Sequence, residues 1–150
     1  MKFSALLLLI FITACHSPMT KTHAFRLKPG EDLKASITAL VKEKNIGAGW
    51  IATVVGSLTN YNIRFANQPD GVQGEGHFEI VSLTGTVSTN GSHLHISVSD
   101  STGKTIGGHL LDGNIVYTTA EIVISETDDV VFTREKDGST PWEELQVKKK

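Results

Sequence analysis

The chain contains a single cysteine, Cys15, among its 150 residues. One thiol cannot form an internal disulfide, which excludes the small secreted folds that disulfides hold together. It also excludes the usual zinc fingers, because they need paired cysteines. The sequence further lacks a nucleotide-binding glycine loop, a nucleophile elbow and an internal repeat. Any chemistry must therefore come from other side chains.

Positive charge is also scarce. The 14 lysines and arginines are outnumbered by 16 aspartates and glutamates, so the formal net charge is −2 at pH 7. Proteins that bind nucleic acid normally present a basic face. This balance does not favour DNA or RNA as a partner. The three lysines at 148–150 form only a short solvated tail.

No apolar run is long enough to cross a bilayer. The run Ala5–Ile12 is far shorter than the roughly 20 residues that a spanning helix needs. It follows Lys2 and is typical of a signal-peptide core. The next residues, Ile12–Cys15, resemble a bacterial lipobox, which predicts a signal peptide over 1–14 and lipidation of Cys15. Multiple acyl chains would anchor the protein stably to a membrane of the cell envelope, on the periplasmic side in a Gram-negative cell. A plain secretory signal that leaves a free thiol is the alternative.

The mature chain suits one domain. Of the 150 residues, removal of 14 leaves 136, which is enough for one modest core and too few for two domains of ordinary size. Residues 15–22 are polar and predict a tether, and the domain is expected over 23–147. After Asp32, apolar residues at helical spacing predict a helix that ends near Gly47, namely Leu33, Ile37, Leu40 and Val41.

Beyond residue 48 the pattern changes to short segments separated by turn residues. Strands are predicted at 50–55, 61–65, 77–83, 93–98, 106–111, 115–124 and 130–133. The glycine-rich segment 66–76 is predicted as a long loop, and Asp112-Gly113 as a tight turn. One helix and many antiparallel strands give an α+β class, with the helix packed on one face of a curved antiparallel sheet.

Three of the six histidines lie in two adjacent predicted strands. Side chains alternate between the two faces of a strand, so His93 and His95 share the polar face of the segment 93–98. The other face carries the apolar residues Leu94, Ile96 and Val98. The following strand places His109 on its own polar face. All three imidazoles are therefore expected on one side of a strand pair.

A hairpin loop sets how these two strands pair. Residues 101–103 are typical of a three-residue loop whose glycine adopts the left-handed conformation. If Asp100 pairs with Lys104, the register places Val98 opposite Ile106, Ile96 opposite Gly108 and His95 opposite His109. Opposed Cβ atoms lie about 4.5–5.5 Å apart, so the imidazoles can converge on one ion. Three neutral nitrogens suit zinc first, and also nickel, copper or iron, and leave a coordination position open. Ordinary surface or packed histidines are the alternative.

The same residues resemble a known family. The segment Gly91–Asp100, followed by Ile106–Leu110, is similar to the signature of the PPC domain, which is conserved in plants and prokaryotes. Four further segments resemble its blocks in the same order: Arg26–Leu33, Gly56–Asn60, Phe78–Gly85 and Tyr117–Val123. The resemblance covers about residues 23–147. It implies a compact α+β domain that is usually a homotrimer, with a divalent-metal site that maps onto His93, His95 and His109.

The resemblance also bears on activity. The PPC domain is similar in fold to acetolactate decarboxylase, a zinc enzyme with a histidine triad, although a shared fold does not carry function. Glu121 is the candidate catalytic acid or base, since proton transfer near a metal-bound water requires such a carboxylate. It is alternatively an exposed strand residue. Asn60, His77 and Glu79 are weaker candidates. Plant relatives bind DNA through separate AT-hook segments, and this chain has none.

Two functional classes remain open. In the first, the protein is a metal-dependent lyase or hydrolase that acts on a small oxygen-rich substrate. In the second, it is a non-catalytic trimeric module that binds or senses a small ligand in the cell envelope. A DNA-binding role ranks below both. A shielded carboxylate beside the metal would favour the enzyme, and a triad on a flat surface would favour the module.

Overall fold

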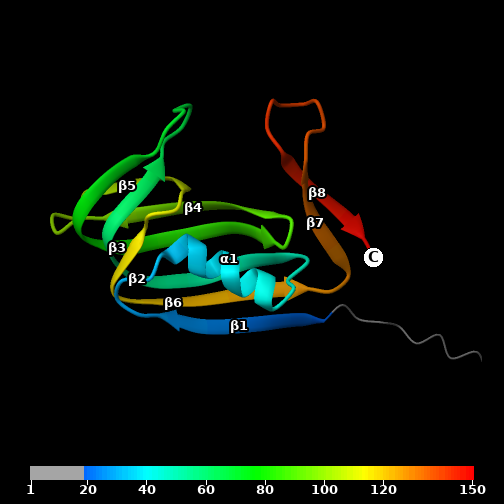
Figure 1. Cartoon of the computed structure of the whole chain (residues 1–150), viewed down its shortest axis with the longest axis horizontal. Helices are drawn as coiled ribbons and strands as arrows, with labels where there is room; N and C mark the ends of the chain where they lie inside the picture. Colours follow the sequence, from blue (N-terminus) through cyan, green and yellow to red (C-terminus); the bar gives the residue numbers. More distant parts are fainter. Residues whose placement is uncertain (1–18) are drawn as a thin grey trace, which may run out of the picture.

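The computed structural model describes residues 19–150, in which strands dominate (Figure 1). The elements are β1 (Thr20–Leu27), α1 (Leu33–Glu43), β2 (Gly49–Arg64), β3 (Val72–Ser88), β4 (Gly91–Ser99), β5 (Thr105–Leu110), β6 (Ile115–Thr127), β7 (Val130–Glu135) and β8 (Glu144–Lys149). An antiparallel six-stranded sheet has the order β1-β6-β2-β3-β4-β5, and β7 pairs with β8 in a separate hairpin. Helix α1 crosses one face of the large sheet. The predicted α+β class is confirmed.

The predicted signal peptide and the lipidation site at Cys15 lie outside the described residues. Within residues 19–150, no helix has the length and apolar character that a membrane crossing requires.

Helix α1 begins at a side-chain cap and buries one stripe. Asp32 is extended, and its carboxylate accepts a hydrogen bond of 2.9 Å from the backbone N–H of Ala35. Leu33, Ile37 and Val41 are buried at helical spacing, as predicted. The helix ends at Glu43, before the predicted end, because the chain leaves helical geometry in the turn that follows, where Asn45 has a φ of 52°.

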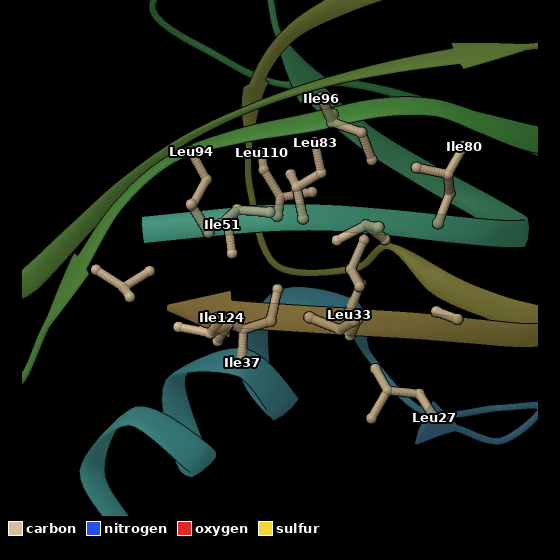
Figure 2. Packing of buried hydrophobic residues seen from close by; sticks show 14 of the residues in the cluster. Leu27, Leu33, Ile37, Ile51, Ile80, Leu83, Leu94, Ile96, Leu110 and Ile124 are labelled. Carbon is tan, nitrogen blue, oxygen red and sulfur yellow. The ribbon is translucent and has the colours of Figure 1, made fainter. Parts of the chain in front are cut away.

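The hydrophobic core lies between α1 and the sheet face that it covers. Figure 2 shows Leu33 and Ile37 directed toward side chains of the central strands, among them Ile51 of β2 and Ile124 of β6. Leu94 of β4 lies in the same core. The apolar side of β4 is therefore turned inward, which leaves its polar side on the outer face of the sheet.

Strand β2 is continuous where the sequence predicted two strands, at 50–55 and 61–65. Gly56 lies inside it with a φ of 152°. A Cβ atom at this position would lie 2.1 Å from the backbone oxygen of Thr119 on β6. The glycine therefore permits a close approach of two strands, and it does not mark a break.

Strand β3 begins at Val72, five residues before the predicted strand at 77–83, so the predicted loop at 66–76 is much shorter. The first part of β3 pairs with the end of β2, where Ile63 lies opposite Val72. Tyr61 packs its ring edge-on against Phe78, with centroids 4.9 Å apart. Pairing with β2 keeps the first residues of β3 in a strand although glycines lie among them. The local sequence does not reveal this partner, so the strand start was not predicted.

Two edge strands were not predicted. β1 pairs with β6 and includes Thr20–Thr22, which the sequence had placed in the tether. β8 includes Lys148 and Lys149, which it had placed in the solvated tail, although both side chains are exposed. Edge strands of this kind lack the apolar alternation on which sequence prediction relies, because only part of each is buried.

The far end of β2 closes the sheet on itself. Besides β3, this end also pairs with β5, with Ile63 opposite Leu110 and Arg64 opposite His109. Shifts in register interrupt several of the strand pairs, which strengthens the local twist and bend. As a result, the side chain of Arg64 emerges beside the predicted metal ligands.

Asn114 ties this closure to the turn before β6, and its removal is expected to destabilise the fold. Its fully buried side chain accepts from the backbone N–H of Asn62 (3.1 Å) and donates to the backbone oxygens of Asn62 (3.1 Å) and Leu111 (2.7 Å). We expect Asn114→Ala to lower the free energy of unfolding by about 2–3 kcal/mol, because these buried groups lose their partners. Urea denaturation measures the loss. Gln68→Ala, on an exposed loop, is the control, expected within about 0.5 kcal/mol of the parent; an equal effect of both substitutions would contradict the role of Asn114.

Candidate metal centre

The β4–β5 hairpin has the predicted register. Val98 pairs with Ile106, Ile96 with Gly108 and His95 with His109. In the loop, the Asp100 carboxylate accepts hydrogen bonds from the backbone N–H groups of Thr102 (2.8 Å) and Lys104 (3.1 Å). A short, internally bonded loop of this kind holds the two strands in one alignment.

Three imidazole nitrogens converge at this hairpin. Nε2 of His93 lies 3.1 Å from Nε2 of His95, and Nδ1 of His109 lies 3.2 Å from both. Nitrogens bound to one tetrahedral zinc at about 2.0–2.1 Å are separated by about 3.3–3.4 Å. The triad is thus close enough to hold one metal ion. Two of its rings, His93 and His109, stack nearly parallel, with an interplanar angle of 9°.

The triad lies on the outer face of the sheet. His93 and His95 are exposed and His109 is half-buried, while the intervening Leu94 and Ile96 are buried. The protein therefore supplies three ligands from one side and leaves the opposite side open to water or a substrate.

The surroundings favour the neutral, metal-binding form of two imidazoles. Burial lowers the pKa of His93 below its ordinary value, and the charges of His95 and Arg134 lower it further. Burial also lowers the pKa of His109, with Arg64 as the next cause. Because a metal competes with protons for these nitrogens, a lowered pKa keeps the site available at more acidic pH.

These directions predict a pH dependence of the metal-free protein. Below about pH 6.5, the ordinary histidine value, the unfolded chain takes up protons that folded His93 and His109 still exclude. Stability should therefore fall as the pH drops from about 6.5 toward the lowered pKa values, and stop falling below them. Melting temperatures of the metal-free protein between pH 7.5 and 4.5 measure this. His93→Gln should flatten the dependence, and an unchanged profile would contradict the assignment.

A cavity of about 570 Å³ adjoins the triad at His93 and His109. Its charged lining comes from separate parts of the chain: Lys34 of α1, Arg64 of β2, Arg134 of β7, Glu143 just before β8 and Glu144 at its start. Trp142, in the loop before β8, is 68% exposed and also lines it. Sequence reasoning missed all of these residues. These residues come together because β2 pairs with β5 and because the β7–β8 hairpin packs against β3. No local sequence pattern predicts either contact.

A second hollow of about 370 Å³ borders the triad at His95 and His109. Ser97, Gly107 and Gly108 line it as well. The triad therefore borders two depressions, and His109 lines both.

The other candidate residues lie away from the triad. Glu121 is exposed on β6, and β2 and β3 separate that strand from β4. Within one chain it is therefore not beside the histidines. His77 stacks on Tyr117, with centroids 4.1 Å apart. Asn60 accepts a hydrogen bond from the Thr59 hydroxyl, and Glu79 is an exposed residue of β3.

A family model for the Plants and Prokaryotes Conserved domain, abbreviated PCC or PPC, matches residues 16–128. The chain belongs to this family. The predicted resemblance is thereby confirmed. The match includes the whole β4–β5 hairpin and ends just before β7, so the triad lies inside the PPC region and the β7–β8 hairpin lies beyond it.

Individual relatives agree with this membership. The PPC chain is 36% identical over 129 residues to the bifunctional protein GlmU of Synechococcus sp. (strain JA-3-3Ab), but spans only 21% of that protein's length. A hypothetical protein from Salmonella cholerae-suis is similar in structure, with a TM-score of 0.87 and 36% identity over 90% of this chain and 98% of that one. A metal-containing protein from Archaeoglobus fulgidus gives a TM-score of 0.72 and 27% identity over 84% of this chain and 93% of that one.

Proposed function

We propose that the triad holds one divalent transition metal, with zinc the first candidate, and that the PPC domain acts as a lyase or hydrolase on a small oxygen-rich substrate. The observation that carries this proposal is the convergence of three imidazole nitrogens, 3.1–3.2 Å apart, at the edge of a cavity of about 570 Å³. A cavity of about 300–1,000 Å³ is the usual size for a small-molecule site. The similarity to a metal-containing protein supports the metal.

The residues around the triad supply what such a reaction needs. A bound divalent ion would polarise a carbonyl oxygen or lower the pKa of a bound water. Glu144, which lines the cavity and is half-buried, is better placed than Glu121 to move a proton within one chain. Its Oε1 accepts a hydrogen bond of 2.6 Å from the Thr140 hydroxyl, which orients the carboxylate. A role for Glu121 would require a second copy of the chain to bring it to the histidines.

Metal content tests the proposal. A soluble form that begins at His16 should hold close to one metal ion per chain, as measured by inductively coupled plasma mass spectrometry. His93→Ala/His95→Ala should lose it, because one remaining imidazole cannot hold the ion tightly. His77→Ala is the matched control, since His77 is an exposed strand histidine outside the triad. Absence of metal after growth and dialysis with zinc would overturn the proposal.

A homotrimeric module is the second candidate, and an exposed apolar surface favours it. Val55 of β2 is 57% exposed, Val81 of β3 is 56% exposed and Tyr117 of β6 is 40% exposed. Their neighbours Val54, Ile80 and Val116 lie in the core, so the three exposed side chains lie on the other face of the sheet. Self-association would cover these side chains. Light scattering should give three times the monomer mass, and Val55→Lys/Val81→Lys should give the monomer mass. A monomeric parent would contradict the trimer. Metal-independent binding without turnover would identify a module rather than an enzyme.

We further propose that Cys15 anchors the protein to a membrane of the cell envelope. The short apolar run and the lipobox-like Ile12–Cys15 support this. The full-length protein expressed in a bacterium should enter the detergent phase in Triton X-114 partitioning, and Cys15→Ser should move it to the aqueous phase. Equal partitioning of the two proteins would contradict lipidation.

A further inference from the structure

The cavity beside the triad gathers most of the arginines of the chain. The chain has three arginines, at positions 26, 64 and 134, and the last two line this cavity. Among residues 19–150, neither of these two arginines forms an ion pair with a carboxylate within 4.0 Å. Because a guanidinium normally recognises an anion with its planar pair of N–H groups, both are available to a ligand.

Arg64 is held beside the metal ligands by the closure of β2 onto β5. It lies directly opposite His109 in the strand register. Its Nη1 donates a hydrogen bond of 3.2 Å to the backbone oxygen of Gln68. That contact orients the guanidinium and leaves further N–H donors for a ligand.

Arg134 reaches the cavity from another element, the β7–β8 hairpin. Its Nη2 donates a hydrogen bond of 2.7 Å to the Thr86 hydroxyl, and its backbone N–H donates one of 2.6 Å to Asn90. These bonds attach the hairpin to β3 and to the turn between β3 and β4. The hairpin thus forms a fixed wall, although it lies beyond the part of the chain that the family model matches.

The balance of charge in the cavity is positive. The lining contains Lys34, Arg64 and Arg134 and the two carboxylates of Glu143 and Glu144, a formal charge of +1. Lys34 is also paired with Asp112 (3.6 Å), which is outside the lining, so the positive charge without an ion-pair partner comes from the two arginines. A divalent ion on the triad would add two further positive charges beside them. A site of this charge, with two guanidinium groups, attracts a multiply charged anion more than a neutral ligand.

We propose that this cavity binds a small organic acid with two anionic groups, one at the metal and the other held by Arg64 and Arg134. This deepens the proposed function, on which the metal-bound end of the ligand rests. The β7–β8 hairpin, through Arg134 and Trp142, determines which acid is accepted. The proposed metal ligands thus lie inside the part of the chain that the family model matches, and selection of the ligand depends on a hairpin beyond the end of that match.

Matched pairs of hydroxy acids test the second anionic group. L-malate and 2-hydroxybutyrate have the same chain length and the same metal-binding end, but only malate has a second carboxylate; 2-hydroxyglutarate and 2-hydroxypentanoate form a longer pair. Isothermal titration of the zinc-loaded protein should show at least one dianion binding about 10-fold or more tightly than its partner, as expected for a charge-assisted contact. Arg64→Gln should abolish this preference. Arg64→Lys should keep part of it, because the charge remains but the paired N–H geometry is lost.

Controls separate this inference from the proposed function. Arg26→Gln removes the same charge from an exposed residue of β1, and should keep the preference. The emission of Trp142 should change on binding, and the change should be absent in Trp142→Phe. If zinc is held but neither pair shows a preference, or if Arg64→Gln retains it, the inference fails and the proposed function stands. If no sample holds zinc, the proposed function fails; the arginine site then stands only if malate is still preferred by the parent and not by Arg64→Gln.

Discussion

Addition of zinc to the metal-free protein is expected to raise its free energy of unfolding by about 4 kcal/mol when free zinc is about 1,000 times its dissociation constant. The three histidines come together only in the folded chain, because the β4–β5 register brings His95 opposite His109. The unfolded chain therefore binds zinc much less tightly, and binding energy becomes folding energy. Urea titrations with a zinc-buffered solution and with chelator measure the difference.

The zinc-dependent rise in the free energy of unfolding should require the triad. His95→Ala removes one of the three proposed ligands and should abolish nearly all of the zinc-dependent stabilisation, while the stability in chelator changes little because His95 is exposed. His77→Ala should leave the zinc response intact, since that imidazole stacks on Tyr117 instead. A stabilisation that persists in His95→Ala would place the zinc elsewhere, and the triad would no longer be the metal centre.

Gly85→Ala is expected to cost about 3–5 kcal/mol, from backbone strain and from overpacking together. Gly85 has a φ of 135°, which L side chains rarely adopt, and a Cβ there would lie 1.9 Å from the backbone oxygen of His93. The added Cβ and the His93 oxygen are both fixed to the main chain, so the backbone of β3 or of β4 must move to relieve the clash. Since domains are stable by only about 5–15 kcal/mol, this is a large fraction of the total.

The same substitution should also weaken metal binding, because the displaced backbone carries His93. Gly47→Ala is the control: Gly47 has no positive φ and no atom within 4 Å of an added Cβ. Urea unfolding compares the two variants, and metal content reports on the triad. Equal midpoints for Gly85→Ala and Gly47→Ala would show that β3 and β4 are not packed as described.

The hairpin that carries the triad could be predicted because its determinants are local. Alternation assigns His93 and His95 to one face, and the loop with Gly103 fixes their alignment with His109 within a few residues of sequence. Helix α1 was predictable for the same reason, since its cap and its buried stripe lie within one segment.

The lining of the cavity could not be predicted, because it depends on contacts between distant segments. Arg64 and His109 are neighbours only because the end of β2 pairs with β5. Arg134 belongs to the β7–β8 hairpin, which its bond to Thr86 holds against the main sheet. The proposed role of Glu121 had the same weakness. Glu121 was a candidate because it lies in one of the sequence blocks of the family, but the order of these blocks along the chain does not give the order of strands in the sheet. Two strands separate β6, which carries Glu121, from β4.

The sheet order also has a consequence for how the protein is made. His95 and His109 are only 14 residues apart, so the hairpin that carries the triad is complete soon after it leaves the ribosome. β1 leaves the ribosome first but pairs only with β6. Its residue His23 can pair with Ile124 only after β6 has been synthesised. Long-range pairings of this kind form slowly. The β4–β5 register can therefore form while the N-terminal edge of the domain is still unpaired, whereas a fixed triad, able to bind an ion tightly, requires the folded sheet.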